Sequence, residues 1–217
     1  MAIADRKIFL ASRSPRRREL LRQIGVGHEL LLLREDSRRG ADVDESPLAG
    51  EAPRDYALRV ATAKAAAGLQ AAARRAGGAM KPVLAADTTI ALDRAIIGKP
   101  ADGADARRIL TALSGRNHVV ITAVAVAYAE RLETRISESV VTLRVLDDAL
   151  IQRYIASGEP MDKAGAYAVQ GRAAAFITRI EGSYSGIMGL PLAETVELLA
   201  AFDIERDRKS TRLNSSH

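Results

Sequence analysis

The sequence predicts an α/β protein, because apolar runs of strand length alternate along the chain with segments of helical periodicity. An apolar run at Ile8–Ala11 leads into a helix signal, and Val83–Ala86 is a continuous apolar run typical of a strand covered on both faces. The 217 residues suffice for one α/β domain or for two lobes around a cleft. We expect residues 1–205 to form a single domain, and residues 206–217 to be a disordered or non-native tail.

The first helix is predicted from its two ends. Ser14 is a favourable N-cap, Pro15 suits the first helical position, and Gly25 ends the helix. Three arginines follow at positions 16–18, although their positive charges are unfavourable next to the partial positive charge of a helix N-terminus. Hydroxyl, guanidinium and free backbone N–H groups at one place predict a phosphate site, the alternative being a capped helix with a solvated basic turn.

The next predicted elements lead to a carboxylate. We expect a second strand at 28–33 and a long helix over residues 53–75, ended by the glycine pair 77–78. The positions at helical spacing in that helix are Tyr56, Val60, Ala63 and Ala67. The strand at 83–86 then delivers Asp87 at its carboxyl end, where ligands bind in open α/β sheets.

The second half of the chain continues the alternation. The patterns predict a turn at 93–94, a helix at 102–113, a hairpin of strands at 119–128 and 134–146, a helix to residue 157 capped by Asp147 or Asp148, a strand at 173–180, a turn at 181–186 and a closing helix at 192–202. The glycine-rich segment 162–171 belongs to none of these elements. In it, Gln170 is a polar side chain beside glycine, which indicates backbone that packs close to a ligand.

The composition excludes several kinds of chemistry. The chain has no cysteine, which rules out thiolate zinc sites and cysteine nucleophiles, and its three histidines argue against a histidine-rich metal centre. Of the net charge of +5, the last twelve residues carry +3, so we do not expect nucleic acid as a partner. The sequence shows no signal-peptide core and no run of about 18 apolar residues, so we expect a cytoplasmic protein without a membrane partner.

Polar side chains that interrupt apolar or glycine-rich contexts are the candidates for a site. They are Ser12, Ser14, Arg16, Arg17, Glu45, Lys64, Asp87, Lys99, Asp162, Lys163 and Gln170. The charged members are five cations and three carboxylates, and the sequence has no Gly-x-Ser-x-Gly nucleophile motif, P-loop or dinucleotide-binding fingerprint. The hypothesis that remains is phosphate chemistry. We expect the cations to hold a polyphosphate, Asp87 and Glu45 to hold Mg²⁺ or Mn²⁺, and a carboxylate to orient or deprotonate a water molecule.

Each candidate also has a structural alternative. Asp87 could cap the end of its strand, and Glu45 could belong to an exposed acidic loop. Lys64 and Lys99 could be solvated surface lysines. The residues alone leave these alternatives open.

Eight short motifs follow one another along the chain. They are Ser12–Leu21 (SRSPRRRELL), Ala86–Thr88 (ADT), Gly98–Pro100 (GKP), Leu113–Gly115 (LSG), Gly158–Pro160 (GEP), Asp162–Tyr167 (DKAGAY), Gln170–Gly171 (QG) and Gly189–Leu192 (GLPL). Together they resemble the Maf family of nucleoside triphosphate pyrophosphatases, from about Ile8 to Phe202. The resemblance implies a two-lobed fold of the Maf and ITPase type, with a central mixed sheet flanked by helices and a cleft between the lobes. It also implies a homodimer and hydrolysis of a nucleotide between its α and β phosphates, dependent on Mg²⁺ or Mn²⁺.

The resemblance assigns roles to the candidates. The catalytic residues would be Asp87, Lys99, Glu45 and Gln170, with Asp87 and Glu45 as the metal ligands. The substrate-binding residues would be Ser12, Ser14, Arg16, Arg17, Lys64, Asp162 and Lys163. Arg13 stands where many members have glycine or another small residue.

The segment 162–171 indicates a branch of the family. Members with Asp-Lys-Ala-Gly-Ala-Tyr and Gln-Gly act on dTTP, UTP and some modified uridine nucleotides, whereas members that act on 7-methyl-GTP carry Cys-Ala-Gly and a Glu near the Gln position. The resemblance therefore predicts hydrolysis of dTTP or UTP to the monophosphate and pyrophosphate, a house-cleaning reaction. Two alternatives stay open: the same reaction on 7-methyl-GTP or another modified nucleotide, and a non-catalytic regulator of septum formation that binds nucleotide or nucleic acid.

Overall fold

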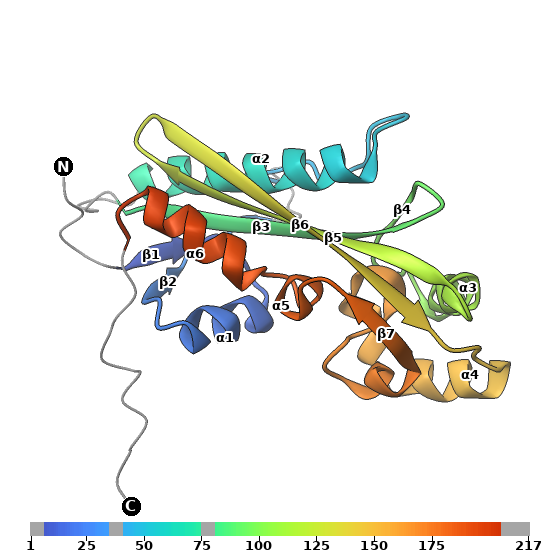
Figure 1. Cartoon of the computed structure of the whole chain (residues 1–217). Helices are drawn as coiled ribbons and strands as arrows, with labels where there is room; N and C mark the ends of the chain where they lie inside the picture. Colours follow the sequence, from blue (N-terminus) through green and yellow to red (C-terminus); the bar gives the residue numbers. More distant parts are fainter. Residues whose placement is uncertain (1–6, 35–40, 75–80, 205–217) are drawn as a thin grey trace, which may run out of the picture.

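A seven-stranded mixed sheet runs through the length of the molecule (Figure 1). The computed structural model describes residues 7–34, 41–74 and 81–204. The strands are β1 (Ile8–Leu10), β2 (His28–Leu30), β3 (Val83–Leu92), β4 (Ala95–Ile97), β5 (Asn117–Tyr128), β6 (Arg131–Leu143) and β7 (Ile177–Glu181). Their order in the sheet is β2-β1-β3-β5-β6-β7, with β4 paired to the carboxyl-terminal end of β3. The predicted α/β class and the central mixed sheet flanked by helices are confirmed.

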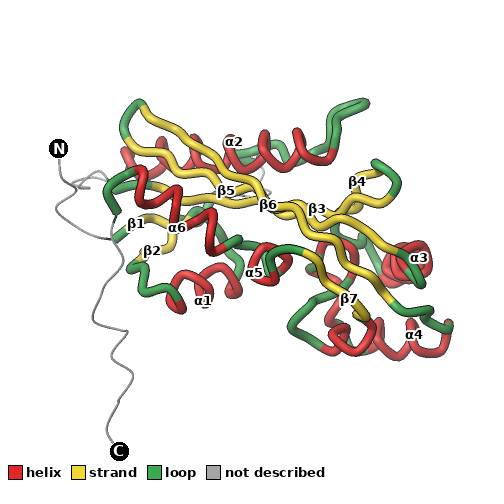
Figure 2. The backbone as a smooth tube through the Cα atoms, in the orientation of Figure 1, coloured by secondary structure: helices red, strands yellow, loops and turns green. Residues whose placement is uncertain are grey.

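Helices cover both faces of this sheet (Figure 2). They are α1 (Pro15–Gln23), α2 (Pro53–Arg74), α3 (Gly103–Leu113), α4 (Asp148–Ala156), α5 (Tyr184–Ile187) and α6 (Leu192–Ala201), and three short 3-10 segments lie at Glu159–Asp162, Ala164–Ala166 and Arg172–Phe176. Helix α2 packs on one face, while α1 and α6 pack on the other, and α3 and α4 lie at the β4 end of the sheet. No helix of the described part of the chain is both long and apolar enough to cross a membrane.

Strand β3 supplies both faces with side chains. Residues 83–86 alternate between the core beneath α2 and the core beneath α1 and α6. Because successive strand residues point to opposite faces, Asp87 lies on the α2 side and Thr88 on the α1 side. Strand β1 is parallel to β3 and ends at Leu10, opposite Leu84. Asp87 and Thr88 therefore lie just beyond the carboxyl end of β1, with α2 above and α1 below the sheet.

The helix ends agree with the prediction because they are encoded locally. The side chains of Ser14, Asp102 and Asp147 each accept a backbone N–H in the first turn of α1, α3 and α4. Gly25 and Gly115 follow α1 and α3 with φ of 70° and 69°, the left-handed conformation that favours glycine at this position. Helix α6 and the β5–β6 hairpin are also confirmed.

Several predicted elements are wrong in their extent. The second strand ends at Leu30, because β1, with which it pairs in the described part of the chain, has three residues. Strand β3 continues to Leu92, so Asp87 lies inside the strand and not at its end. The strand expected over 173–180 begins only at Ile177, after a 3-10 segment, and α5 begins inside the turn expected at 181–186.

The buried face of α2 is also shifted from the predicted one. Val60 is fully buried at one of the predicted positions, but the other fully buried side chains include those of Ala57, Ala61 and Ala65, whereas Ala63 and Ala67 are only partly buried. In a helix so rich in alanine the apolar pattern does not distinguish one face from the next. The predicted glycine pair 77–78 and tail 206–217 lie outside the described residues.

Candidate active site

All eleven candidates from the sequence line one cavity of about 990 Å³. They come from the turn before α1, α1 itself, the loop before α2, α2, β3, the loop after β4, and the segment 162–171. The fold thus brings together residues that are up to 158 positions apart in the sequence. Their individual roles stay predictions.

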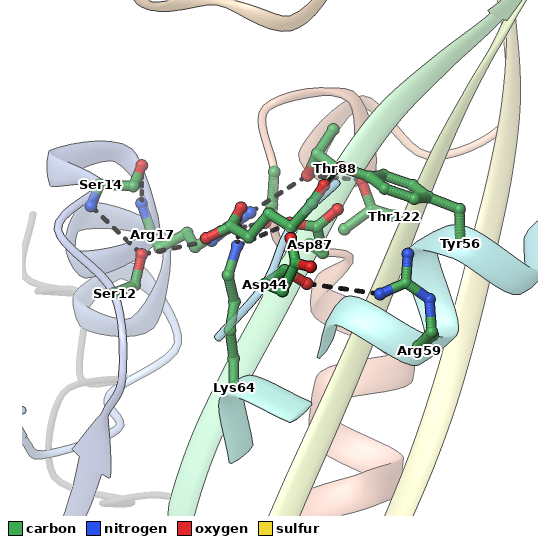
Figure 3. A network of polar contacts seen from close by, with 12 residues as sticks. Ser12, Ser14, Arg17, Asp44, Tyr56, Arg59, Lys64, Asp87, Thr88 and Thr122 are labelled. Carbon is green, nitrogen blue, oxygen red and sulfur yellow. Dashed lines mark hydrogen bonds and ion pairs between the residues drawn. The ribbon is translucent and has the colours of Figure 1, made fainter. Parts of the chain in front are cut away.

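The turn before α1 fixes the guanidinium group of Arg17 (Figure 3). Ser12 Oγ accepts hydrogen bonds from the Ser14 backbone N–H and from Arg17 Nη1, both at 3.2 Å. Arg17 Nε donates to the Gly189 carbonyl at 2.7 Å, and its Nη2 donates to Thr88 Oγ1 at 3.3 Å. One guanidinium therefore joins α1, β3 and the loop before α6.

The three partners of Arg17 are neutral oxygens. Burial lowers the pKa of Arg17 from its ordinary value, and the negative charge of Asp87 opposes that shift. An arginine nevertheless keeps its charge at neutral pH. A partly buried cation whose hydrogen-bond partners are uncharged favours an anion nearby, which is the property expected of a phosphate contact.

Lys64 contacts the carboxylates of Glu45 and Asp87 on the opposite face of β3, and Figure 3 shows it beside Asp87. Its Nζ is 2.7 Å from Glu45 Oε2 and 2.8 Å from Asp87 Oδ1. The side chain of Asp87 is 9% exposed and that of Glu45 is 44% exposed. Alanines and Gly68 let α2 approach the sheet closely, since a Cβ on Gly68 would lie 2.7 Å from a methyl carbon of Val83. This close packing allows a lysine of α2 to reach a carboxylate of β3.

The two carboxylates fit a hard divalent cation. Mg²⁺ is commonly bound by one or two carboxylates together with the phosphates of a substrate. Glu45 and Asp87 already share one cationic group, the Lys64 ammonium. Within the described ranges no cluster of three or more histidine, aspartate or glutamate side chains is placed to hold a metal ion. These two carboxylates therefore suit a cation whose remaining ligands come from the nucleotide phosphates, and not a site in which the protein supplies every ligand.

The loop after β4 and the segment 162–171 carry the remaining candidates. Lys163 pairs with the neighbouring Asp162, and Lys99 and Gln170 are exposed. The backbone N–H of Gly165 donates to the Gly98 carbonyl at 2.9 Å, which ties the segment 162–171 to the loop that carries Lys99.

Arg16 lies half-buried on the α1 side of the cavity. Its positive charge lowers the pKa of Arg17, after the larger effect of burial. The two neighbouring arginines therefore concentrate positive charge at the start of α1.

Among the lining residues that were not candidates, Thr88 and Tyr56 each bond to a candidate residue. Thr88 Oγ1 accepts from Arg17 and, at 3.0 Å, from Thr122 Oγ1 on β5. Tyr56 lines the cavity and donates to the Glu45 carbonyl at 3.0 Å. A signal for Tyr56 was present, because Tyr56 and Lys64 are eight residues apart on α2 and so lie near one face of the helix.

The fold and the cavity define an α/β protein with a site for a phosphorylated ligand. Cations of α1 line one face of β3, and a lysine-bridged pair of carboxylates lies on the other. The arrangement can bind a polyphosphate and hold a divalent cation beside it.

Comparison of the sequence with known protein families shows to which family this chain belongs. Residues 7–202 match the family described as Maf-like protein, so the chain belongs to the Maf family.

Similar proteins named dTTP/UTP pyrophosphatase cover most of the chain. The one from Nitrosomonas europaea is 54% identical over 192 residues, which are 88% of this chain and 92% of the relative. The one from Aromatoleum aromaticum is 56% identical over 200 residues, or 90% and 95% of the two chains. The one from Ralstonia nicotianae is 56% identical over 197 residues, or 89% and 92%.

Proposed function

We propose that this protein is a nucleoside triphosphate pyrophosphatase that hydrolyses dTTP and UTP to the monophosphate and pyrophosphate. The observation that carries the proposal is the placement of Arg17 and of the Glu45–Lys64–Asp87 group around one cavity. Relatives more than 50% identical over most of the chain bear the name dTTP/UTP pyrophosphatase, which supports this activity and its role in house-cleaning of the nucleotide pool.

The residues on the two faces of β3 have different roles in the proposed reaction. Ser12, Ser14, Arg16 and Arg17 bind the phosphates from the α1 side, and Lys99 binds them from the loop after β4. Asp87 orients and deprotonates a water molecule that attacks the α-phosphorus. The bond between the α-phosphorus and the bridging oxygen then breaks, and pyrophosphate leaves with its charge held by the same cations.

Pyrophosphatases of the Maf family generally use divalent cations. Glu45 and Asp87 are the ligands that we propose for Mg²⁺ or Mn²⁺, which would neutralise phosphate charge next to the attacking water. Lys64 pairs with both carboxylates, because its ammonium group contacts each of them, and it restrains the nearly buried Asp87 more than the exposed Glu45.

Lys163 and Gln170 are proposed to select the base. An ammonium group and a side-chain amide can both donate to the carbonyl oxygens of uracil or thymine. Asp162 pairs with Lys163 and orients it. The homodimer and the cytoplasmic location stay predictions that rest on the resemblance and on the sequence pattern.

A panel of nucleotides tests the proposal. The protein is incubated with Mg²⁺ and dTTP, UTP, 7-methyl-GTP or the other common nucleoside triphosphates, and monophosphate and pyrophosphate are quantified. We expect dTTP and UTP to be the best substrates and Asp87→Asn to abolish their turnover. Turnover undiminished in Asp87→Asn contradicts the catalytic assignment, and preference for 7-methyl-GTP favours the first alternative. Binding of nucleotide or DNA without any turnover favours the non-catalytic regulator.

A further inference from the structure

Two side chains of α2, Tyr56 and Arg59, hold three consecutive backbone carbonyls around Glu45; the contact between Arg59 and Asp44 is drawn in Figure 3. Arg59 Nη1 donates to the carbonyl of Asp44 at 3.4 Å, and Arg59 Nη2 donates to the carbonyl of Ser46 at 3.0 Å. Between them, the Tyr56 hydroxyl donates to the carbonyl of Glu45 at 3.0 Å. The backbone on both sides of Glu45 is thus bound to one helix.

Arg59 is itself fixed by a carboxylate of the same loop. Its Nε is 2.6 Å from Glu51 Oε1, and its Nη2 is 2.8 Å from Glu51 Oε2, so the contact is bidentate. The hydrogen bonds from Arg59 lower the pKa of Glu51 to about 2, which keeps this carboxylate charged at neutral pH. Glu51 Oε2 also accepts the backbone N–H of Leu48 at 3.0 Å. Both ends of the segment 44–51 are therefore tied to Arg59.

Tyr56 keeps the proton that its hydrogen bond needs. Burial, together with the negative charges of Asp87 and Glu45, raises the pKa of Tyr56 to about 12. The Arg59 guanidinium lies 5.5 Å from the centre of the Tyr56 ring, so the two side chains also support each other. The hydroxyl remains a donor throughout the neutral pH range.

All of these bonds to the Glu45 backbone leave its carboxylate free to face the cavity. That carboxylate is 44% exposed and contacts Lys64 at 2.7 Å, so the Lys64 contact alone gives it weak restraint. We propose that Arg59 is a positioning residue, which holds the backbone at Glu45 so that its carboxylate lies beside Asp87 before metal and nucleotide bind. This inference rests on the proposed function, in which Glu45 is a metal ligand. A ligand held in place before binding loses less conformational entropy when the metal binds.

Hydrogen exchange tests the positioning directly, without metal or nucleotide. Arg59→Lys keeps the positive charge but cannot reach the two carbonyls and the Glu51 carboxylate together. The amides of Ser46 and Leu48 report the segment, because they donate to Asp44 Oδ1 and Glu51 Oε2. We expect both amides to exchange faster in Arg59→Lys than in the wild type.

The control variant is Arg54→Lys, also on α2. Arg54 pairs with Glu138 on β6 and, within the described residues, makes no hydrogen bond or ion pair with the segment 44–51, so exchange there should be unchanged. Tyr56→Phe removes a single hydroxyl and should change exchange in the same direction by a smaller factor, which keeps the test decisive if Arg59→Lys folds poorly. Equal exchange in Arg59→Lys and Arg54→Lys overturns the proposal.

Kinetics then test whether the positioning acts through Glu45. In Arg59→Lys we expect the Mg²⁺ concentration for half-maximal activity to rise and kcat to fall, each by about 10-fold, with a smaller change in KM for the nucleotide. In a Glu45→Ala background the same substitution should have no further effect on the Mg²⁺ dependence. An equal loss in both backgrounds overturns the inference. Absence of turnover in the wild type instead refutes the proposed function, while the exchange measurement still decides whether Arg59 holds the segment.

Discussion

Replacing Lys64 by methionine removes the one ammonium group that Glu45 and Asp87 share. The side chain of Asp87 is 9% exposed, so its carboxylate would lose an ion-pair partner in a nearly dry position. Loss of one partner of such a pair costs about 3 kcal/mol, and the half-exposed Glu45 contact adds less than about 1 kcal/mol. For a chain of this length, 3 kcal/mol corresponds to a fall in Tm of about 6–12 °C.

The assay is thermal unfolding with and without Mg²⁺. Without metal, Lys64→Met should melt well below the wild type. Added Mg²⁺ should raise the Tm of the variant more than that of the wild type, because the ion replaces the missing charge between the carboxylates. Lys81→Met is the matched control, since Lys81 is 14% exposed against 15% for Lys64 and pairs with an exposed glutamate away from the cavity. The reasoning is refuted if Lys64→Met is no less stable than Lys81→Met, or if Mg²⁺ stabilises it no more than the wild type.

Three further substitutions test other parts of the molecule. Arg17→Lys should lower kcat/KM by about 100-fold in steady-state kinetics, because lysine cannot bind the carbonyl and both hydroxyls and still face a phosphate. Burial lowers the pKa of His118 to about 4, so between pH 6.5 and pH 4 the unfolded chain takes up a proton that the folded chain does not. Stability should therefore fall by up to about 3 kcal/mol as the pH drops through that window, and urea unfolding at pH 7.5 and 4.5 should show a smaller fall in His118→Gln. Gly165→Ala should destabilise the protein more than Gly158→Ala in thermal unfolding: both glycines have positive φ, but a Cβ on Gly165 would lie 2.2 Å from an Ile90 carbon, while nothing lies within 4 Å of one on Gly158.

Helix boundaries could be predicted because their signals are local. In α1, an N-cap serine, a proline and a terminal glycine lie within twelve residues and depend on no distant part of the chain. The length of β3 could not be predicted in the same way, because Asp87, Thr88 and Thr89 interrupt its apolar pattern. These polar residues stay in the strand because β5 pairs with them, Lys64 bridges to the first, and Thr122 bonds to the second. The pattern thus fails where the strand enters the site, as expected for functional positions.

The candidate residues were easier to name than the contacts between them. Arg17 and Lys64 stand out in the sequence as charges in a helix start and on an alanine-rich helix. Their partners depend on tertiary packing: Gly189 is 172 positions from Arg17 and is brought to it by the return of the chain to α6. The role of Arg59 is likewise hidden, because it binds backbone carbonyls, which every residue has.

The alternation of β3 explains how one cavity can hold groups of opposite charge without neutralising them all. Seven lysines and arginines and four carboxylates occur among the described residues that line it, a net charge of +3. Glu45 and Asp87 are paired through Lys64 on the α2 side, whereas the hydrogen bonds of Arg17 to described residues on the α1 side all go to neutral oxygens. Since Asp87 and Thr88 are neighbours in a strand, one peptide unit separates the two sides, and the sheet keeps that separation fixed. The excess positive charge on the α1 side therefore remains available to bind a triphosphate. It lies next to the carboxylates on the α2 side, which would activate the attacking water.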